Sequence, residues 1–142
     1  ANNHWGLQIA HLVKGKYNTT GDTTTLEKKY WYNKYRMESV TELQELLETT
    51  MKASLFEKIK QPVLMLYYYK DEEHQDKTVK VSAMKRMFRQ LGTPDSLKRE
   101  IAVPNAEDHV IGSYITSKDL ATVEKESIRF GEEILRLHVF KQ

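Results

Sequence analysis

The sequence predicts an α/β fold in which a helical N-terminal region is followed by two parallel strands, each with a helix after it. Three observations favour this fold class. Apolar residues recur at helical spacing before Gln61 and Pro62, residues 63–69 form an unbroken apolar and aromatic run, and residues 97–103 alternate in polarity. Because a helical segment separates the two strand-like segments, we expect the strands to pair in parallel.

Residues 1–59 are expected to be mainly helical. Apolar spacing predicts a short helix over residues 5–14, and turn-forming residues predict a polar loop over residues 15–25. A longer helix is predicted over residues 26–51, because apolar residues recur every three or four positions in its second half. One more short helix is predicted over residues 53–59. The apolar positions of the first and the longer helix are Trp5, Ile9, Leu12, Val13, Val40, Leu43, Leu46, Leu47 and Met51.

Residues 60–142 are expected to form a β-α-β-α unit. The run over residues 63–69 predicts a strand that is buried on both faces, as in a parallel sheet. A helix is predicted over residues 82–91, and a second strand over residues 97–103. The last helix is predicted to begin with Ser117 as its N-cap. Its buried residues are expected to be Leu120, Val123, Phe130, Ile134 and Leu137.

Length and composition are typical of one folded domain. The chain has 142 residues, of which 39% are apolar and 30% charged, and domains most often contain about 100–150 residues. A balance of 22 basic against 20 acidic residues gives a net charge of +2, which argues against the concentrated basic face of a nucleic-acid-binding protein. The absence of cysteine excludes disulfides, Cys-ligated metals and a thiol nucleophile. It leaves the cellular compartment open.

No segment predicts a membrane span or a signal peptide. The longest apolar run, residues 63–69, is much shorter than the roughly 20 residues that a spanning helix needs. The first six residues have neither a basic start nor an apolar stretch. They also lack an initiator methionine, so we expect a processed product or a part of a longer chain.

Two loops at the carboxyl ends of the predicted strands hold the candidate reactive groups. The first contains Asp71, His74 and Asp76, and the second contains His109. Reactive groups gather at this end of open parallel sheets, and neighbouring strands lie about 4.8 Å apart, so a carboxylate of the first loop can meet His109. Such a pair lets the imidazole act as a general base toward a hydroxyl nucleophile. Polar loops also carry such residues without a catalytic role, and the pattern alone leaves that interpretation open.

The order of these segments resembles the C-terminal part of the α/β-hydrolases. The resemblance rests on three segments. The first is the strand that starts at Gln61-Pro62-Val63-Leu64, and the second is Asp76-Lys77-Thr78-Val79, which matches the family's D-x-x-V acid loop. The third runs from Pro104 to His109 and is similar to the family's P-x-A-x-H loop. It covers residues 60–142. The resemblance further implies that residues 1–59 are a helical cap, so that the chain has a partial α/β-hydrolase fold.

The resemblance implies a serine hydrolase that acts on an ester, amide or related acyl bond and needs no cofactor. Asp76 would be the triad acid and His109 the triad histidine. The family's Gly-x-Ser-x-Gly elbow is absent around all seven serines, and in the family it lies upstream of the cap. We therefore expect the C-terminal portion of a larger hydrolase, inactive alone. The alternative is a non-catalytic domain that binds a protein partner through its helical half.

Two aspartates compete for the role of triad acid. Asp71 directly follows the predicted strand, which is the usual position in the family. Asp76 begins the D-x-x-V match and lies 33 residues before His109, whereas Asp71 lies 38 residues before it. The family's usual gap is shorter than either, so Asp76 is the preferred acid and Asp71 the reserve. Residues 71–75 would then be a small insertion.

Three further groups have a simpler interpretation. His74 stands among carboxylates, but metal ligands usually come from separated positions or helix-spaced pairs, so we expect a solvated loop and no metal. Ser113 lies four residues after His109 and lacks a nucleophile elbow. Trp31 and Tyr35 would share one face of the helix predicted over residues 26–51, and packing within the region is the simplest interpretation.

The hydrolase resemblance gives Trp31 and Tyr35 a second interpretation, as the lining of an apolar pocket for the substrate. Their basic neighbours also suggest stacking on nucleic-acid bases, but several glutamates in the same region disfavour nucleic acid as a partner. The strand over residues 63–69 would have an unpaired edge where the family's earlier strands lie. Because exposed apolar edges associate, we expect a homodimer through this edge.

Overall fold

The computed structural model describes residues 17–19 and 24–138. The chain divides into two compact units, residues 1–52 and 53–142, and each unit is described by itself. The helix expected over residues 5–14, with its apolar side of Trp5, Ile9, Leu12 and Val13, lies outside the described residues.

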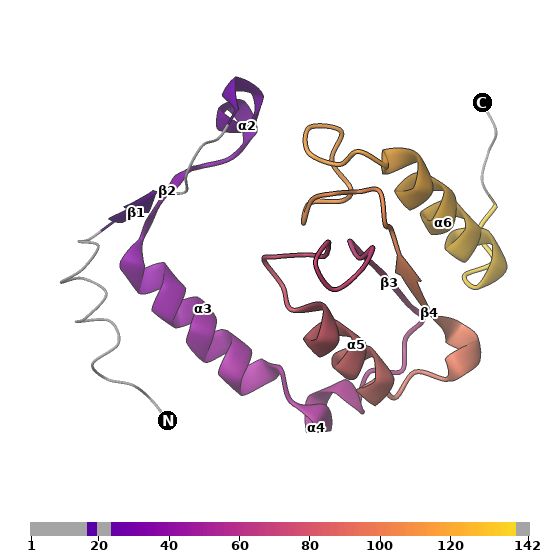
Figure 1. The fold of residues 1–142 in the computed structure, drawn as a ribbon. Coiled ribbons are helices and arrows are strands. Elements are labelled where there is room, and N and C mark those ends of the chain that lie inside the picture. Colours follow the sequence, from indigo (N-terminus) through magenta and orange to yellow (C-terminus); the bar gives the residue numbers. More distant parts are fainter. Residues whose placement is uncertain (1–16, 20–23, 139–142) are drawn as a thin grey trace. The chain divides into compact units, whose positions relative to one another are not determined.

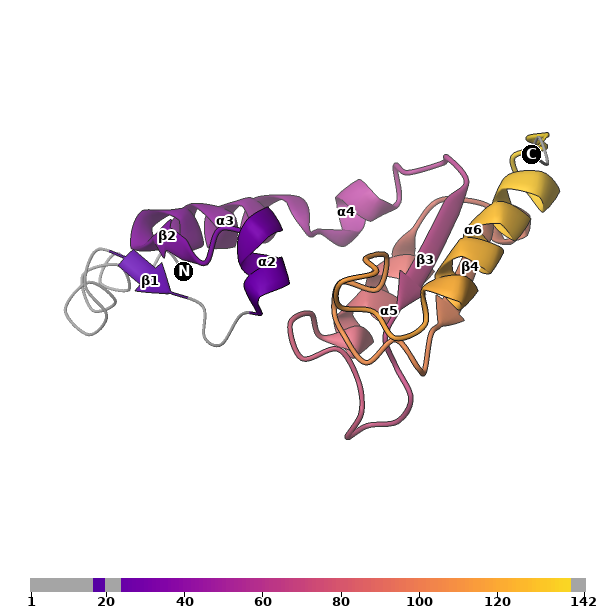
Figure 2. The ribbon, with the colours of Figure 1, turned by 90° about the horizontal axis from the view of Figure 1, so that it is seen from above.

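In its described residues, the first unit combines two helices with a small antiparallel strand pair (Figures 1 and 2). Strand β1 (Tyr17–Thr19) pairs with β2 (Lys34–Arg36), with Tyr17 opposite Arg36. Helix α2 (Thr25–Tyr30) lies between the two strands in sequence, and α3 (Met37–Thr50) directly follows β2.

The single helix expected over residues 26–51 and the loop expected over residues 15–25 are therefore wrong in part. The helix is interrupted after Tyr30, and β2 takes up the residues before Met37. Aromatic residues have low helix propensity and favour extended structure, and the segment from Tyr30 to Tyr35 holds four of them. Pairing with β1 then stabilises the extended backbone.

Helix α2 begins at a capping box. The backbone N–H of Glu27 donates to the Thr24 hydroxyl (3.2 Å), and the backbone N–H of Thr24 donates to the Glu27 carboxylate (2.5 Å). Two N–H groups that the helix leaves unpaired are thereby satisfied.

The second unit is built around a parallel strand pair. Strand β3 (Val63–Tyr67) pairs with β4 (Lys98–Ala102), in a register that runs from Val63 opposite Lys98 to Tyr67 opposite Ala102. Helix α5 (Val81–Gln90) and a 3₁₀ turn (Asp95–Leu97) connect them. The expected α/β class with parallel strands is confirmed. The finer assignment to an α/β-hydrolase fold stays a prediction.

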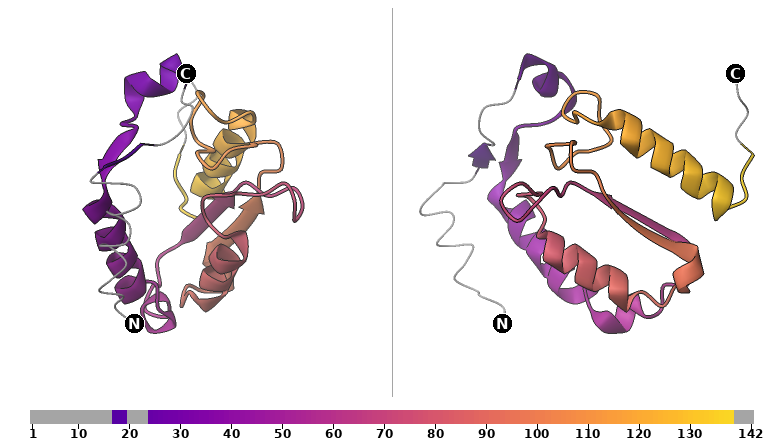
Figure 3. Two further views of the ribbon diagram at one scale, coloured as in Figure 1. Left: turned by 60° about the vertical axis from the view of Figure 1, so that its left-hand side comes forward. Right: turned by 45° about the vertical axis from the view of Figure 1, so that its right-hand side comes forward.

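Helices α5 and α6 (Leu120–Glu133) cover opposite faces of this strand pair (Figure 3). The buried cluster lies on the α5 side, and its members are Phe56, Met65, Tyr67, Val81, Phe88 and Leu91. Phe56 belongs to the short helix α4 (Ala53–Phe56). Although the sequence placed this helix with the first region, it packs with the second, and it ends three residues earlier than expected.

Other features of the second unit also differ from the sequence-based expectations. Strand β3 ends at Tyr67. Its buried residues, Met65 and Tyr67, share one face, so the expectation of a strand buried on both faces is wrong. Helix α6 is capped by Asp119, which accepts the N–H of Thr122 (3.2 Å), and not by Ser117. The helix ends at Glu133, so Leu137 is exposed and not part of the core. Of the other residues expected to be buried, only Phe130 is, and Leu120, Val123 and Ile134 are half-buried. Both Ser and Asp are good N-caps, and they stand two residues apart here.

None of the helices in residues 24–138 is long and apolar enough to cross a membrane.

Candidate functional site

Asp76 and His109 lie on loops that leave the same end of the parallel strand pair. Tyr67 and Ala102 are opposite each other at the carboxyl ends of β3 and β4. The backbone N–H of Val103 donates to the carbonyl of Tyr67 (2.8 Å), which extends the pairing by one residue. Both loops therefore start from one fixed edge, as expected for neighbouring parallel strands.

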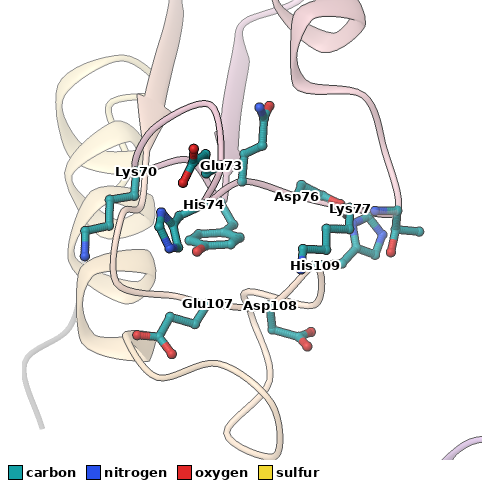
Figure 4. A pocket seen from close by; sticks show the side chains of 11 residues that line it. Lys70, Glu73, His74, Asp76, Lys77, Glu107, Asp108 and His109 are labelled. Atoms are coloured by element: carbon teal, nitrogen blue, oxygen red, sulfur yellow. Dashed lines mark hydrogen bonds and ion pairs between the residues drawn. The ribbon is translucent and has the colours of Figure 1, made fainter.

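The structure brings the side chains of Asp76 and His109 into direct contact (Figure 4). Nδ1 of His109 lies 2.6 Å from Oδ2 of Asp76. The Asp76 side chain is 3% exposed, whereas that of His109 is 42% exposed. The pair therefore has a buried carboxylate on one side and an accessible imidazole on the other.

Asp76 is also held by its own loop. Its Oδ1 accepts the backbone N–H groups of Thr78 (2.7 Å) and Val79 (2.9 Å), an arrangement in which an Asp side chain forms a turn with the residues that follow it. Burial acts to raise the pKa of Asp76, but the hydrogen bonds from His109, Val79 and Thr78 together outweigh burial and hold the pKa below its ordinary value. The carboxylate is thus ionised at neutral pH.

The loop that carries His109 contains an unusual backbone conformation. Glu107 has a φ of 57°, the left-handed region that residues other than glycine rarely adopt. Lys118 fixes this turn twice, by donating its backbone N–H to the carbonyl of the buried Ala106 (3.0 Å) and its Nζ to the Glu107 carboxylate (2.6 Å). The loop has one residue more between Ala106 and His109 than the P-x-A-x-H pattern, and the turn at Glu107 accommodates it.

The reserve acid Asp71 is engaged elsewhere. Its carboxylate lies 2.8 Å from Nδ1 of His74 and accepts the backbone N–H groups of Glu73 (2.9 Å) and His74 (2.7 Å). The hydrogen bond from the His74 side chain, followed by those from the backbone, lowers the pKa of Asp71. The structure thus pairs Asp71 with His74 and Asp76 with His109. The roles of these residues in catalysis stay a prediction.

A cavity of about 520 Å³ lies between the two loops. Its wall is polar, and both imidazoles contribute to it. In Figure 4, His74 lies with Lys70 and Glu73 on the turn after β3, well apart from His109 and Asp76. The lining residues are Tyr68, Lys70, Glu73, His74, Gln75, Asp76, Lys77, Thr78, Glu107, Asp108 and His109. A small polar molecule therefore has room beside the accessible face of His109.

Within residues 17–19 and 24–138, no group of three or more His, Asp or Glu side chains is arranged to hold a metal ion.

Trp31 and Tyr35 do not share a helix face, which corrects the expectation from their spacing. Trp31 follows the last residue of α2, and Tyr35 lies on β2. Asn18 of β1 donates a hydrogen bond to the Tyr35 hydroxyl, so Tyr35 helps to join the strand pair. Their role as the lining of a substrate pocket stays a prediction.

Sequence reasoning missed the backbone donors at Thr78 and Val79 and the turn at Glu107. The first had a signal, because an Asp followed by a short polar segment often forms such a turn. The second had none, since Glu is not a residue that indicates a left-handed backbone.

Comparison of the chain with protein-family models, with curated proteins and with solved structures found no match.

Proposed function

We propose that this chain supplies the acid and the histidine of a serine hydrolase of the α/β-hydrolase type, which acts on an ester, amide or related acyl bond. The observation that carries the proposal is the hydrogen bond between the buried carboxylate of Asp76 and the accessible imidazole of His109. The nucleophilic serine would come from a part of the protein that lies outside this sequence.

The chemistry follows from the protonation state of the pair. An ionised carboxylate can only accept hydrogen bonds, so Nδ1 of His109 must donate its hydrogen to Asp76. In the neutral imidazole the lone pair is then on Nε2. This nitrogen can take the proton of a serine hydroxyl as the serine attacks the substrate carbonyl, and Asp76 stabilises the imidazolium that forms. The same imidazolium can return the proton to the leaving group.

The serines of this chain are poor candidates for the nucleophile. None stands in a Gly-x-Ser-x-Gly elbow. The hydroxyl of Ser113, the serine nearest to His109 in sequence, accepts the backbone N–H of Ile115 (3.2 Å). We therefore propose that the chain alone does not hydrolyse simple esters.

One observation favours the alternative, a domain that binds a protein partner through its helical half. In α3, Met37 is the only buried residue, while the apolar side chains of Val40, Leu43 and Leu47 remain exposed. Large exposed apolar patches mark interaction sites in many proteins. This alternative predicts that substitutions on α3 abolish binding to a partner, while His109 has no role.

The proposal is tested with the natural protein that contains this sequence. A fluorophosphonate probe reacts with an activated serine, so we expect it to label the natural protein and not its His109→Ala variant. The matched control is His74→Ala, because His74 also forms an Asp–His pair at the same cavity. Labelling that survives His109→Ala, or that is absent from the natural protein, contradicts the proposal.

A further inference from the structure

A second cavity, of about 500 Å³, shares Gln75, Asp76, Lys77 and Thr78 with the wall of the first. It lies at the start of α5 and has no assigned role in the proposed hydrolysis. Its wall contains three lysines, two carboxylates and three hydroxyl groups. The lining residues are Tyr69, Glu72, Gln75, Asp76, Lys77, Thr78, Lys80, Val81, Ser82 and Lys85.

The lysines of this wall are not held in ion pairs. Lys77, Lys80 and Lys85 form no ion pair with any carboxylate in the described part of the chain. A cavity wall with more basic than acidic side chains favours an anion.

Both carboxylates of the wall are already engaged. Glu72 accepts hydrogen bonds from the Tyr69 hydroxyl (2.9 Å) and from the side-chain amide of Gln75 (3.3 Å). Asp76 uses one oxygen for His109 and the other for two backbone N–H groups. Neither forms an ion pair with a lysine of the wall, and the three lysines and two carboxylates together leave the wall a formal charge of +1.

The position of Lys85 is set by aromatic rings. Its Nζ lies 4.4 Å from the centre of the Tyr69 ring and 5.5 Å from that of the buried Tyr67. A cation held over aromatic faces is oriented without being neutralised. Thr78 and Ser82 line the same wall, and no hydrogen bond from either hydroxyl to another described residue is present.

We propose that this cavity binds the phosphate group of a small organic phosphate, a phosphomonoester. A phosphate dianion carries three terminal oxygens, which match three ammonium groups and two hydroxyl donors better than the two oxygens of a carboxylate do. The cavity is much larger than one phosphate ion and lies within the usual range for small-molecule sites, so it also has room for the organic group. This inference does not depend on the hydrolase proposal.

The test is a titration of the chain with phenyl phosphate, followed through its backbone amide resonances by NMR at constant ionic strength. We expect saturable shifts at residues 77–82, with a dissociation constant in the millimolar range. Lys80→Ala should weaken binding about two- to fivefold, the effect of one exposed charge, and Lys80→Glu should weaken it further. The control is Lys58→Ala, since Lys58 lies outside the cavity and should leave binding unchanged.

Three results would overturn the inference. One is an equal set of shifts with sodium chloride alone, which would show only charge screening. Another is an equal affinity in the natural chain and Lys80→Glu, with both chains folded by their amide spectra. The third is binding to vesicles that contain phosphatidic acid but not to phenyl phosphate, because the ligand would then be a lipid surface. Weaker binding of Lys80→Ala with an unchanged Lys58→Ala supports the inference.

Discussion

Nδ1 of His109 lies 2.6 Å from Oδ2 of Asp76, although the two residues are 33 positions apart in sequence. Parallel pairing of β3 and β4 sets both loops at one edge, and the hydrogen bonds to Thr78 and Val79 then orient the carboxylate. The contact is thus produced by the fold of the second unit itself. It can be tested on this chain by itself.

Asp76→Asn is expected to remove the short hydrogen bond to Nδ1. An imidazole N–H that donates to a carboxylate gives a far-downfield proton resonance, so the Hδ1 signal of His109 should be visible in the natural chain and lost in the variant. Asp71→Asn is the matched control and should leave that signal in place, since Asp71 pairs with His74. Loss of the signal in both variants would mean that the assignment of the pair is wrong.

Under the hydrolase proposal, the same pair should decide turnover by the natural protein. We expect Asp76→Asn to lower kcat about 10⁴-fold, because the amide favours the wrong imidazole tautomer and cannot stabilise the imidazolium. His109→Ala should abolish measurable turnover without unfolding the protein, and Asp71→Asn should do little. If Asp71→Asn is severe and Asp76→Asn mild, the acid is Asp71; if neither matters, the hydrolase proposal fails.

Asp76 should make the chain sensitive to acid. Its pKa in the folded state is lower than the ordinary value of 3.8, so the unfolded chain binds the proton more readily. The stabilisation is fully present above pH 3.8 and is lost as the pH falls through the folded-state pKa. Urea unfolding of the natural chain and of Asp76→Asn at a series of pH values should show a difference in stability that shrinks in acid. A difference that is constant with pH contradicts this explanation.

Gly92 is expected to be a position that only glycine can occupy. A Cβ atom there would overlap the backbone carbonyl oxygen of Glu57, and the backbone N–H of Gly92 donates to the carbonyl of Phe56 (3.1 Å). Gly92→Ala should therefore lower the free energy of unfolding by about 1–3 kcal/mol. Gly112→Ala is the control, because a Cβ at Gly112 meets nothing within 4 Å, and it should change stability by less than about 0.5 kcal/mol.

Strand β3 pairs only with β4 among the described residues. Its other edge offers unpaired backbone groups, and such edges tend to pair with another chain. We expect sedimentation analysis at tens of micromolar to show a homodimer. A monodisperse monomer under those conditions would count against both the dimer and the interpretation of this chain as a part of a larger sheet.

Local patterns predicted the second unit well, because its elements have strong local signals. The apolar run before Tyr67 and the apolar face of α5 each indicate one structure, and their order implies parallel pairing. The contact between Asp76 and His109 follows from that pairing. The contact between Asp71 and His74 does not follow from the strand pairing, because it depends on the conformation of the turn after β3.

The first unit was predicted less well, because a nonlocal interaction decides it. Strand β2 forms because it pairs with Tyr17–Thr19. This partner lies outside residues 26–51, so the apolar periodicity of that segment could not predict the pairing. The prediction of the residue that caps α6 was wrong for a different reason. Ser117 and Asp119 have similar intrinsic preferences for the position, and only the local backbone selects Asp119.

Backbone hydrogen bonds close the base of the turn between β3 and Asp76. The N–H of Lys70 donates to the carbonyl of His74 (2.9 Å), and the N–H of Asp76 donates to the carbonyl of Tyr68 (3.1 Å). Exposed residues 71–74 thus protrude from a closed base, and the second of these bonds holds Asp76 independently of them. This turn is consequently a suitable site for the insertion of a reporter peptide or a fluorescent label. The label would lie beside the cavity and report on ligand binding there, while Asp76 stays in contact with His109.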